Sequence, residues 1–151
     1  MAIRMKTSVT LKASGQGKSH ALTDISVRNL VFPIDEPEAR GGTNLGPTPT
    51  ETAIAALMGC TNVIGNKCAE SIGVDIGNLR MEASCEFDRR GVTLAEEIDV
   101  PFTSVRLDVY ADGAASAEQL EHVGNETDKY CPLAKLFNAA GTKLVVQWHK
   151  E

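Results

Sequence analysis

The sequence lacks the features that mark several large classes of protein. Its 151 residues include only three histidines, His20, His122 and His149, which lie far apart, and its four cysteines contain no CxxC pair. We therefore expect neither a zinc site nor the disulfide scaffold of a small secreted protein. Fifteen Lys and Arg face 20 Asp and Glu, for a net charge of −5, and the basic residues do not cluster. This balance argues against a nucleic-acid partner.

Long apolar runs are also missing. The longest one, Ala53 to Met58, is far too short to span a bilayer, and the first residues hold no apolar targeting segment. We therefore expect no membrane partner, and we place the protein in the cytoplasm.

What the sequence does contain is enough apolar chain for a core. With 42% hydrophobic residues and six prolines, we expect one domain that spans residues 1–151. Alternating polar and apolar residues predict two or three antiparallel strands between residues 5 and 35, with Gly15 and Gly17 in the first turn. Further strands are expected at 78–88, 103–111 and 143–149, and helices at 116–129 and 132–141. Strands that are segregated from helices predict an α+β fold with antiparallel sheets.

The strongest helix signal begins at Thr48. Thr48, Pro49 and Glu51 fit the N-cap, the first-turn proline and the third residue of a capping box. The helix should run about 23 residues, to Ser71 or Ile72, before Gly73 ends it. Its first half is apolar on every side, which predicts a long, fully buried central helix. Gly59 and Gly65 within it predict the close approach of another element.

The cysteines are the main candidates for chemistry. Cys60 and Cys68 lie about 12 Å apart along the expected helix, which is beyond the reach of a disulfide. Cys68 and Cys85 are typical of small packing residues. Cys131 is therefore the plausible chemical partner of Cys60. It precedes Pro132 at a helix start, where free N–H groups favour a thiolate, although a simple capping role is the alternative.

Cys60 would need help to react. It lies too far into its helix for the helix dipole to act, so a cation or a hydrogen-bond donor must activate it, and otherwise it is a core residue. Glu51 is a candidate to orient such a cation, beside its capping role. The candidate cations are Arg4, Arg28, Arg40, Arg80, Arg89, Arg90 and Arg106.

Three stretches together resemble one protein family. They are Gly42-Thr-Asn-Leu-Gly-Pro-Thr-Pro-Thr-Glu-Thr-Ala-Ile-Ala-Ala-Leu-Met-Gly-Cys-Thr61, Phe102-Thr-Ser-Val-Arg-Leu-Asp-Val109 and Lys129-Tyr-Cys-Pro-Leu-Ala-Lys135. The chain resembles the OsmC/Ohr family of osmotically inducible and organic-hydroperoxide-resistance proteins. The resemblance implies an α+β intertwined homodimer with two active sites at the subunit interface.

The resemblance also implies a chemistry. Cys60 would attack an organic hydroperoxide and become a sulfenic acid, and Cys131 would condense with it to form a disulfide. A dithiol reductant would then restore both thiols. No metal or organic cofactor is implied, because the thiolate is itself the nucleophile.

The sequence departs from the hydroperoxidase branch at two places. That branch has a glutamate directly after the helix-opening proline, where Thr50 stands here, and an arginine in the first turn, where this chain has Ser14-Gly-Gln-Gly-Lys18. The chain is more similar to the less characterised OsmC-like branch. Two functions follow: a thiol peroxidase, or a non-catalytic dimeric stress protein that binds a small hydrophobic ligand and uses its cysteines as redox sensors.

Overall fold

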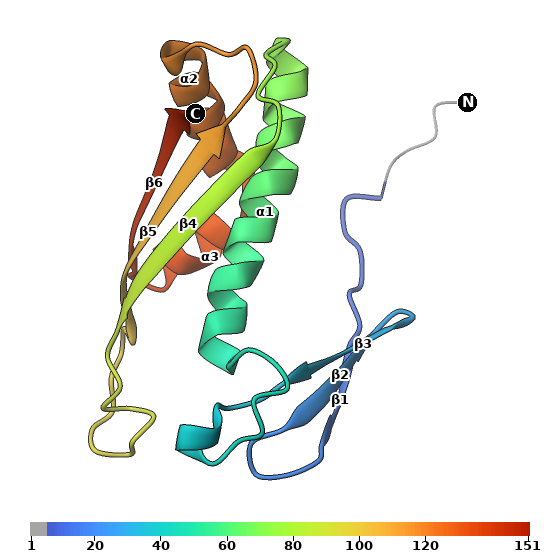
Figure 1. The fold of residues 1–151 in the computed structure, drawn as a ribbon, viewed down its shortest axis with the longest axis vertical. Coiled ribbons are helices and arrows are strands. Elements are labelled where there is room, and N and C mark those ends of the chain that lie inside the picture. Colours follow the sequence, from blue (N-terminus) through green and yellow to red (C-terminus); the bar gives the residue numbers. More distant parts are fainter. Residues whose placement is uncertain (1–5) are drawn as a thin grey trace. The chain divides into compact units, whose positions relative to one another are not determined.

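The computed structural model describes residues 6–151 and has a mixed α+β architecture, which confirms the expected fold class (Figure 1). Contacts divide the chain into two compact parts, Met1–Thr52 and Ala53–Glu151. A three-stranded sheet lies in the first part, and a second three-stranded sheet with three helices forms the second. None of these helices has the length and apolar character that a bilayer crossing requires, as far as residues 6–151 are concerned.

The first sheet is an antiparallel meander, as predicted. Its strands are β1 (Ser14–Gly17), β2 (Thr23–Val27) and β3 (Leu30–Ile34). Residues 7–13, with the exposed Val9 and Leu11, lie outside any strand, and residue 5 lies outside the described residues.

The predicted position of the first turn was wrong. Gly15 and Gly17 belong to β1, and the turn follows them, where the Lys18 N–H donates to the Leu22 carbonyl. A Cβ at Gly15 would lie 3.3 Å from Ile25 Cδ1, so glycine here permits close packing against β2 rather than a reversal of the chain.

A buried carboxylate organises the segment after β3. The Asp35 side chain accepts hydrogen bonds from the backbone N–H groups of Glu36, Thr43 and Leu45 and from the Thr43 hydroxyl. Between these donors lies the short 3-10 helix η1 (Glu38–Arg40). The donors hold the loop closed around the carboxylate and lead the chain to the start of the long helix.

The second sheet consists of β4 (Leu79–Phe87), β5 (Phe102–Ala111) and β6 (Lys143–Lys150), in that order. β4 and β5 are antiparallel, but β5 and β6 are parallel, so the expectation of purely antiparallel sheets was wrong. The reason is that α2 (Ala117–Tyr130) and α3 (Pro132–Ala139) carry the chain back along the sheet before β6 begins.

The long helix α1 (Pro49–Ile72) has the predicted bounds, and Gly73 follows it with a left-handed φ of 70°. It is not buried on every side within one chain. Leu57, Thr61 and Gly65 face the core, whereas Ala55, Gly59 and Val63 are exposed. The expectation of full burial therefore fails for a single copy, because the second sheet, α2 and α3 supply apolar neighbours to one side of α1 only.

The core of the second part lies between the helices and one face of the sheet. The inward-facing residues Val105, Leu107 and Val109 of β5 pack with Leu57 of α1 and Phe137 of α3. A second cluster joins the far end of α1 to α2, through Cys68, Leu120 and Val123. The opposite face of the sheet is polar.

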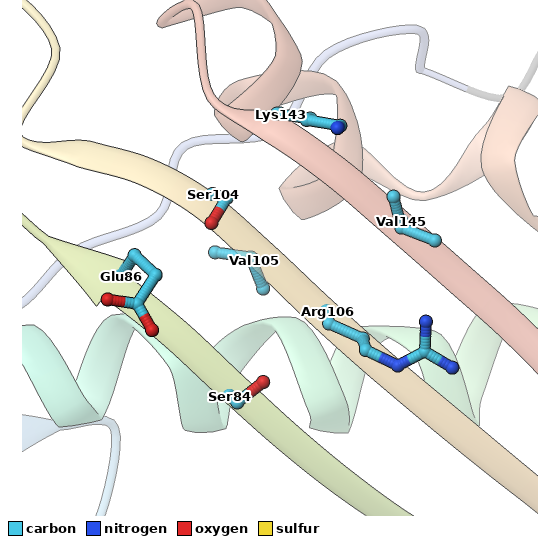
Figure 2. Close-up of a pocket in the computed structure, with 7 residues that line it drawn as sticks. All are labelled: Ser84, Glu86, Ser104, Val105, Arg106, Lys143 and Val145. Atoms are coloured by element: carbon cyan, nitrogen blue, oxygen red, sulfur yellow. The ribbon is translucent and has the colours of Figure 1, made fainter.

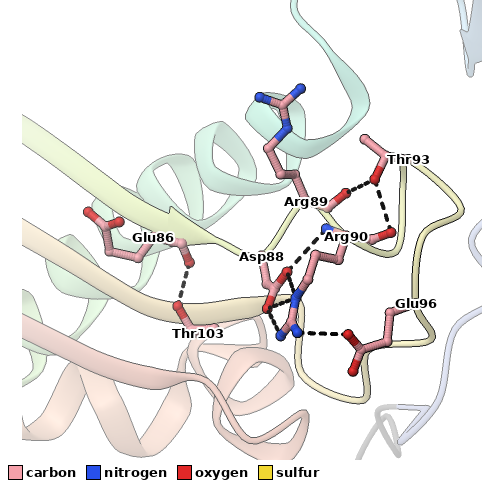
Figure 3. Close-up of polar contacts among 7 residues, drawn as sticks. All are labelled: Glu86, Asp88, Arg89, Arg90, Thr93, Glu96 and Thr103. Carbon is pink, nitrogen blue, oxygen red and sulfur yellow. Dashed lines mark hydrogen bonds and ion pairs between the residues drawn. The ribbon is translucent and has the colours of Figure 1, made fainter.

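The link between β4 and β5 is ordered by ion pairs. Arg90 bridges Asp88 and Glu96, with N–O distances of 2.7 and 2.8 Å, and the Thr93 hydroxyl donates to the Arg89 and Arg90 carbonyls (Figure 3). Because both partners of Arg90 lie within the link, these contacts fix the shape of the link itself.

Candidate active site

Cys60 and Cys131 meet in one apolar cluster. Cys60, on the inner side of α1, packs against the cluster that contains Leu57, Phe137 and the fully buried Cys131. Both thiols are free. The structure therefore brings together two cysteines that lie far apart in the sequence, as a reactive pair would require.

Cys131 caps α3 as predicted. Its Sγ accepts a hydrogen bond from the Ala134 N–H at 3.4 Å, and Pro132 occupies the first helical turn. Burial nevertheless raises the pKa of the Cys131 thiol, and the neighbouring Cys60 thiol raises it further, against the lowering effect of the Ala134 N–H. Loss of solvent on burial thus opposes the thiolate that the helix terminus favours.

Glu51 makes the capping box that the sequence predicts. Its carboxylate accepts from the Thr48 N–H at 2.9 Å, and its own N–H donates to Thr48 Oγ1 at 3.2 Å. Hydrogen bonding of the carboxylate to the backbone and to the side chain of Thr48, followed by the charge of Arg40, lowers the pKa of the Glu51 carboxyl. Glu51 and Cys60 are nine positions apart on α1, which is about 13.5 Å and two and a half turns, so they point to opposite sides of the helix.

Most candidate arginines already have partners. In the second part of the chain, Arg80 pairs with Glu82 and Glu151, and Arg106 pairs with Asp108, both on the polar face of the sheet. Arg90 is held within the β4–β5 link, where Arg89 is exposed. In the first part, Arg28 occupies the β2–β3 turn, and Arg40 pairs with Glu36. Arg4 lies outside the described residues.

The other two cysteines have packing positions. Cys68 is buried in the second cluster, between α1 and α2. Cys85 points inward from β4, packs against the same cluster as Cys60, and has its thiol pKa raised by burial. A raised pKa disfavours the reactive thiolate form.

An aromatic group that no sequence motif indicates lies beside the cysteine pair. Phe102 packs edge-on against Phe87 and Phe137, with ring centroids 5.1 and 5.4 Å apart. All three rings belong to different elements, so only their apolar character at inward-facing positions could have indicated them. They give the cysteine cluster an apolar wall.

With this geometry in place, comparison with known proteins identifies the family. The model of the OsmC-like protein family matches residues 42–147, a span that includes both Cys60 and Cys131. The chain belongs to the OsmC-like protein family. None of the curated proteins compared with this OsmC-like protein matches it.

Solved structures share the fold of this OsmC-like protein at low identity. An OsmC-like protein from Mycoplasma pneumoniae is 13% identical, with a TM-score of 0.75, over 96% of this chain and 98% of that one. An organic hydroperoxide resistance protein from Elizabethkingia anophelis is 16% identical, with a TM-score of 0.70, over 97% and 100%. The organic hydroperoxide resistance protein OhrB of Bacillus subtilis is 20% identical, with a TM-score of 0.63, over 95% and 98%. These likenesses establish the fold.

Proposed function

We propose that this OsmC-like protein is a cytoplasmic thiol peroxidase that reduces organic hydroperoxides. The observation that carries the proposal is the meeting of the free thiols Cys60 and Cys131 in one apolar cluster. Structural neighbours named for organic hydroperoxide resistance support the same chemistry. The apolar surroundings, with Phe102 at their edge, favour a substrate with an apolar body over hydrogen peroxide.

The reaction follows from the two thiols. The Cys60 thiolate attacks the terminal oxygen of the hydroperoxide, the O–O bond breaks, and the alkoxide takes a proton and leaves as an alcohol. Cys60 is then a sulfenic acid. The Cys131 sulfur attacks the Cys60 sulfur, and the hydroxide leaves as water. A dithiol reductant supplies two electrons and two protons to restore both thiols.

The raised pKa of the Cys131 thiol argues against Cys131 as the group that attacks the peroxide. A protonated thiol reacts poorly with peroxide, so the first attack is left to Cys60. The proton that Cys131 carries can leave with the hydroxide when the disulfide forms. Burial of Cys131 thereby separates the two roles.

We further propose that the active unit is a homodimer. α1 exposes a face of small and apolar residues, which includes Ala55, Gly59 and Val63. Among residues 6–151, no atom outside the helix lies within 4 Å of a Cβ built at Gly59. Val9 and Leu11 are also highly exposed. A second copy would cover such surfaces, since monomers seldom leave them in solvent.

Glu51 and Arg40 are proposed to act across that dimer. Because Glu51 and Cys60 lie on opposite sides of α1, the orienting role of Glu51 would apply to Cys60 of a second copy. Arg40 is the arginine whose charge acts on the Glu51 carboxylate, so it is our candidate for the activating cation.

Turnover of cumene hydroperoxide with a dithiol tests the function. Cys60→Ser should abolish peroxide consumption, Cys131→Ser should allow one attack per site, and Cys68→Ser, as the matched control, should retain activity. Mass spectrometry should find a Cys60–Cys131 disulfide. Full turnover by Cys60→Ser would refute the proposal.

Subunit complementation tests the role of Glu51. The Cys60→Ser and Glu51→Gln homodimers should both be impaired, whereas a mixed dimer holds one site with an intact Cys60 and an intact Glu51. Activity in the mixture well above both homodimers supports the cross-subunit arrangement. Activity no higher than the mean of the two homodimers contradicts it.

A non-catalytic stress protein that binds a small hydrophobic ligand is the second candidate. It is favoured by the engagement of Glu51 with Thr48, which leaves its carboxylate less free to orient a cation. Wild-type protein that binds an apolar dye at the cysteine cluster, but shows no turnover with any dithiol, would support this function instead.

A further inference from the structure

β6 is an edge strand of the second sheet. The sheet order is β4, β5, β6, and Figure 2 shows Ser84, Arg106 and Val145 on these three strands in turn. Within residues 6–151, the backbone of residues 144–149 makes no hydrogen bonds other than those of the β5–β6 pair. The other edge of β6 therefore carries unpaired N–H and carbonyl groups, which can pair with another extended chain.

A hollow of about 480 Å³ follows this edge. It is lined by four successive residues of β6, Val146 to His149, and by residues of α2. Successive residues of a strand point to opposite faces of the sheet, so a hollow that touches four in a row lies along the edge of the strand rather than on one face. We call this hollow, between α2 and the unpaired edge of β6, the α2–β6 groove.

One side of α2 forms the other wall of the groove. Glu121 and Asp128 lie three residues before and four residues after Gly124, so all three are on the same side of the helix. Gly124 directs this side toward β6, because a Cβ built there would lie 2.6 Å from Trp148 Cδ1. The other α2 residues of the wall are uncharged. Among the described residues of α2, this wall therefore holds two carboxylates and no cation.

Neither carboxylate has a cationic partner in the described part of the chain. Glu121 and Asp128 take part in none of its ion pairs. The basic groups at the end of β6 are engaged elsewhere, since His149 bonds to Asp108 at 2.7 Å and Lys150 donates to a backbone carbonyl. The surrounding protein also removes solvent from the Asp128 carboxyl, which raises its pKa. A cation in the groove would compensate this negative charge.

We propose that the α2–β6 groove binds an extended basic segment of another protein. The segment would add to the edge of β6 as a further strand, and its backbone hydrogen bonds would supply the affinity. Its side chains would alternate between the two faces of the sheet, and those on the side of α2 would be Lys or Arg, which pair with Glu121 and Asp128. Cys60 and Cys131 do not line the groove, so this binding does not rest on the proposed peroxidase function.

Charge argues against a second copy of this chain as the occupant. If β6 paired antiparallel with β6 of another copy, the two α2 helices would lie side by side on the same face of the joined sheet. Glu121 and Asp128 of the two copies would then approach one another, and like charges repel. A basic segment avoids this repulsion and neutralises the carboxylates.

Titration of the labelled protein with peptides, followed by its backbone amide signals, tests the proposal. The first peptide is acetyl-Thr-Lys-Val-Lys-Val-Lys-Thr-amide, and the second has Glu in place of each Lys. We expect saturable shifts at residues 144–149, and about tenfold tighter binding of the Lys peptide at constant ionic strength. Equal binding of the two peptides, or shifts confined to residues outside the groove, would overturn the proposal.

N-methylated peptides show whether the Lys peptide pairs with the edge of β6. Alternate N–H groups of an extended peptide point to opposite sides, so methylation of its Lys residues and methylation of its Val residues block different sides. One of the two sets should abolish binding, and the other should not. The same effect from both sets would contradict strand addition. Exchange protection of every amide in residues 144–149 without peptide would also contradict it, because the edge would already be covered.

Charge-neutralising variants test the role of α2. Glu121→Gln and Asp128→Asn should each weaken binding of the Lys peptide about threefold, and together about tenfold. Glu118→Gln, at an exposed position of α2 outside the groove, is the matched control and should leave the affinity unchanged. An unaltered amide spectrum outside α2 shows that each variant is folded. Wild-type affinity in the folded double variant would refute the proposed site.

Discussion

The part of the chain up to Thr52 and the part from Ala53 onward bury opposite kinds of residue. Within residues 6–52, only Asp35 and Thr48 are buried, and both are polar. From Ala53 onward, the buried set is mainly apolar and includes Leu57, Leu107 and Leu120. Hydrogen bonds to a carboxylate therefore organise the first part, whereas apolar packing stabilises the second. Acid should therefore destabilise the first part, and cavity-forming substitutions should destabilise the second.

The largest effect is expected from a cavity in the second part. Leu107 is fully buried at the centre of β5, so Leu107→Ala should lower the free energy of unfolding by about 2–5 kcal/mol. Val31→Ala, on the exposed side of β3, should change it by less than about 0.5 kcal/mol. Urea unfolding measures both changes, and equal losses would contradict the comparison.

Overpacking the core should lower the free energy of unfolding by less than a cavity does. A Cβ at Gly124 of α2 would lie 2.6 Å from Trp148 Cδ1, so Gly124→Ala should destabilise the fold by about 1–3 kcal/mol. The exposed neighbour Asn125 provides the control, since Asn125→Ala leaves the ring its space. If thermal unfolding shows that Asn125→Ala is less stable than Gly124→Ala, the glycine is not needed for packing.

Acid should loosen the first part selectively. The hydrogen bond from the Thr43 hydroxyl, supported by three backbone N–H groups and opposed by burial, lowers the pKa of Asp35 from 3.8 to about 2. A lowered pKa stabilises the fold above pH 4, and this stabilisation is lost as the pH falls from about 4 through about 2. The protection of the Thr43 and Leu45 amides, that is, the intrinsic exchange rate relative to the observed one, should therefore decrease as the pH falls over this range.

Asp35→Asn should abolish that pH dependence, because the amide does not titrate there. Glu38→Gln, in the exposed η1 helix, should leave it intact. If the exchange at Thr43 follows the same pH curve in wild type and Asp35→Asn, the carboxylate does not organise the loop.

The smallest effects should come from the helix caps, one of which lies in each part. Thr48 and Ser116 both make complete capping boxes, the first with Glu51 and the second with Gln119. Thr48→Ala and Ser116→Ala should each cost about 1 kcal/mol. Since Thr48 is buried and Ser116 is exposed, a much larger loss for Thr48→Ala in urea unfolding would show that its role extends beyond the cap.

The elements that the sequence predicted well are those with local signals. Pro49 and Gly73 bound α1, and Ser116 and Pro132 open the next two helices, because caps and breakers act within a few residues. Strand direction has no such signal. The alternation of Leu144, Val146 and Trp148 predicts a strand in either orientation, so the parallel pairing of β6 was missed.

The candidate site was predictable in a different way. The positions of Cys60 and Cys131 in their helices followed from local patterns. Their proximity depends on how α1 and α3 pack, and only the elimination of the other cysteines and the family resemblance pointed to it. The burial that raises the pKa of Cys131 is a property of the fold, so no local pattern could indicate it. Asp35 was overlooked because its donors lie up to ten residues away in an irregular loop.

The position of Trp148 makes it an intrinsic fluorescence probe. It is the sole tryptophan of the chain, and its ring lies against Gly65 of α1 and Gly124 of α2. Its indole Nε1 is shielded from solvent and has no hydrogen-bond partner in residues 6–151. The emission wavelength of this single indole therefore depends on the packing between α1 and α2. Because α1 also carries Cys60, oxidation that moves this helix would change the fluorescence of the unlabelled protein.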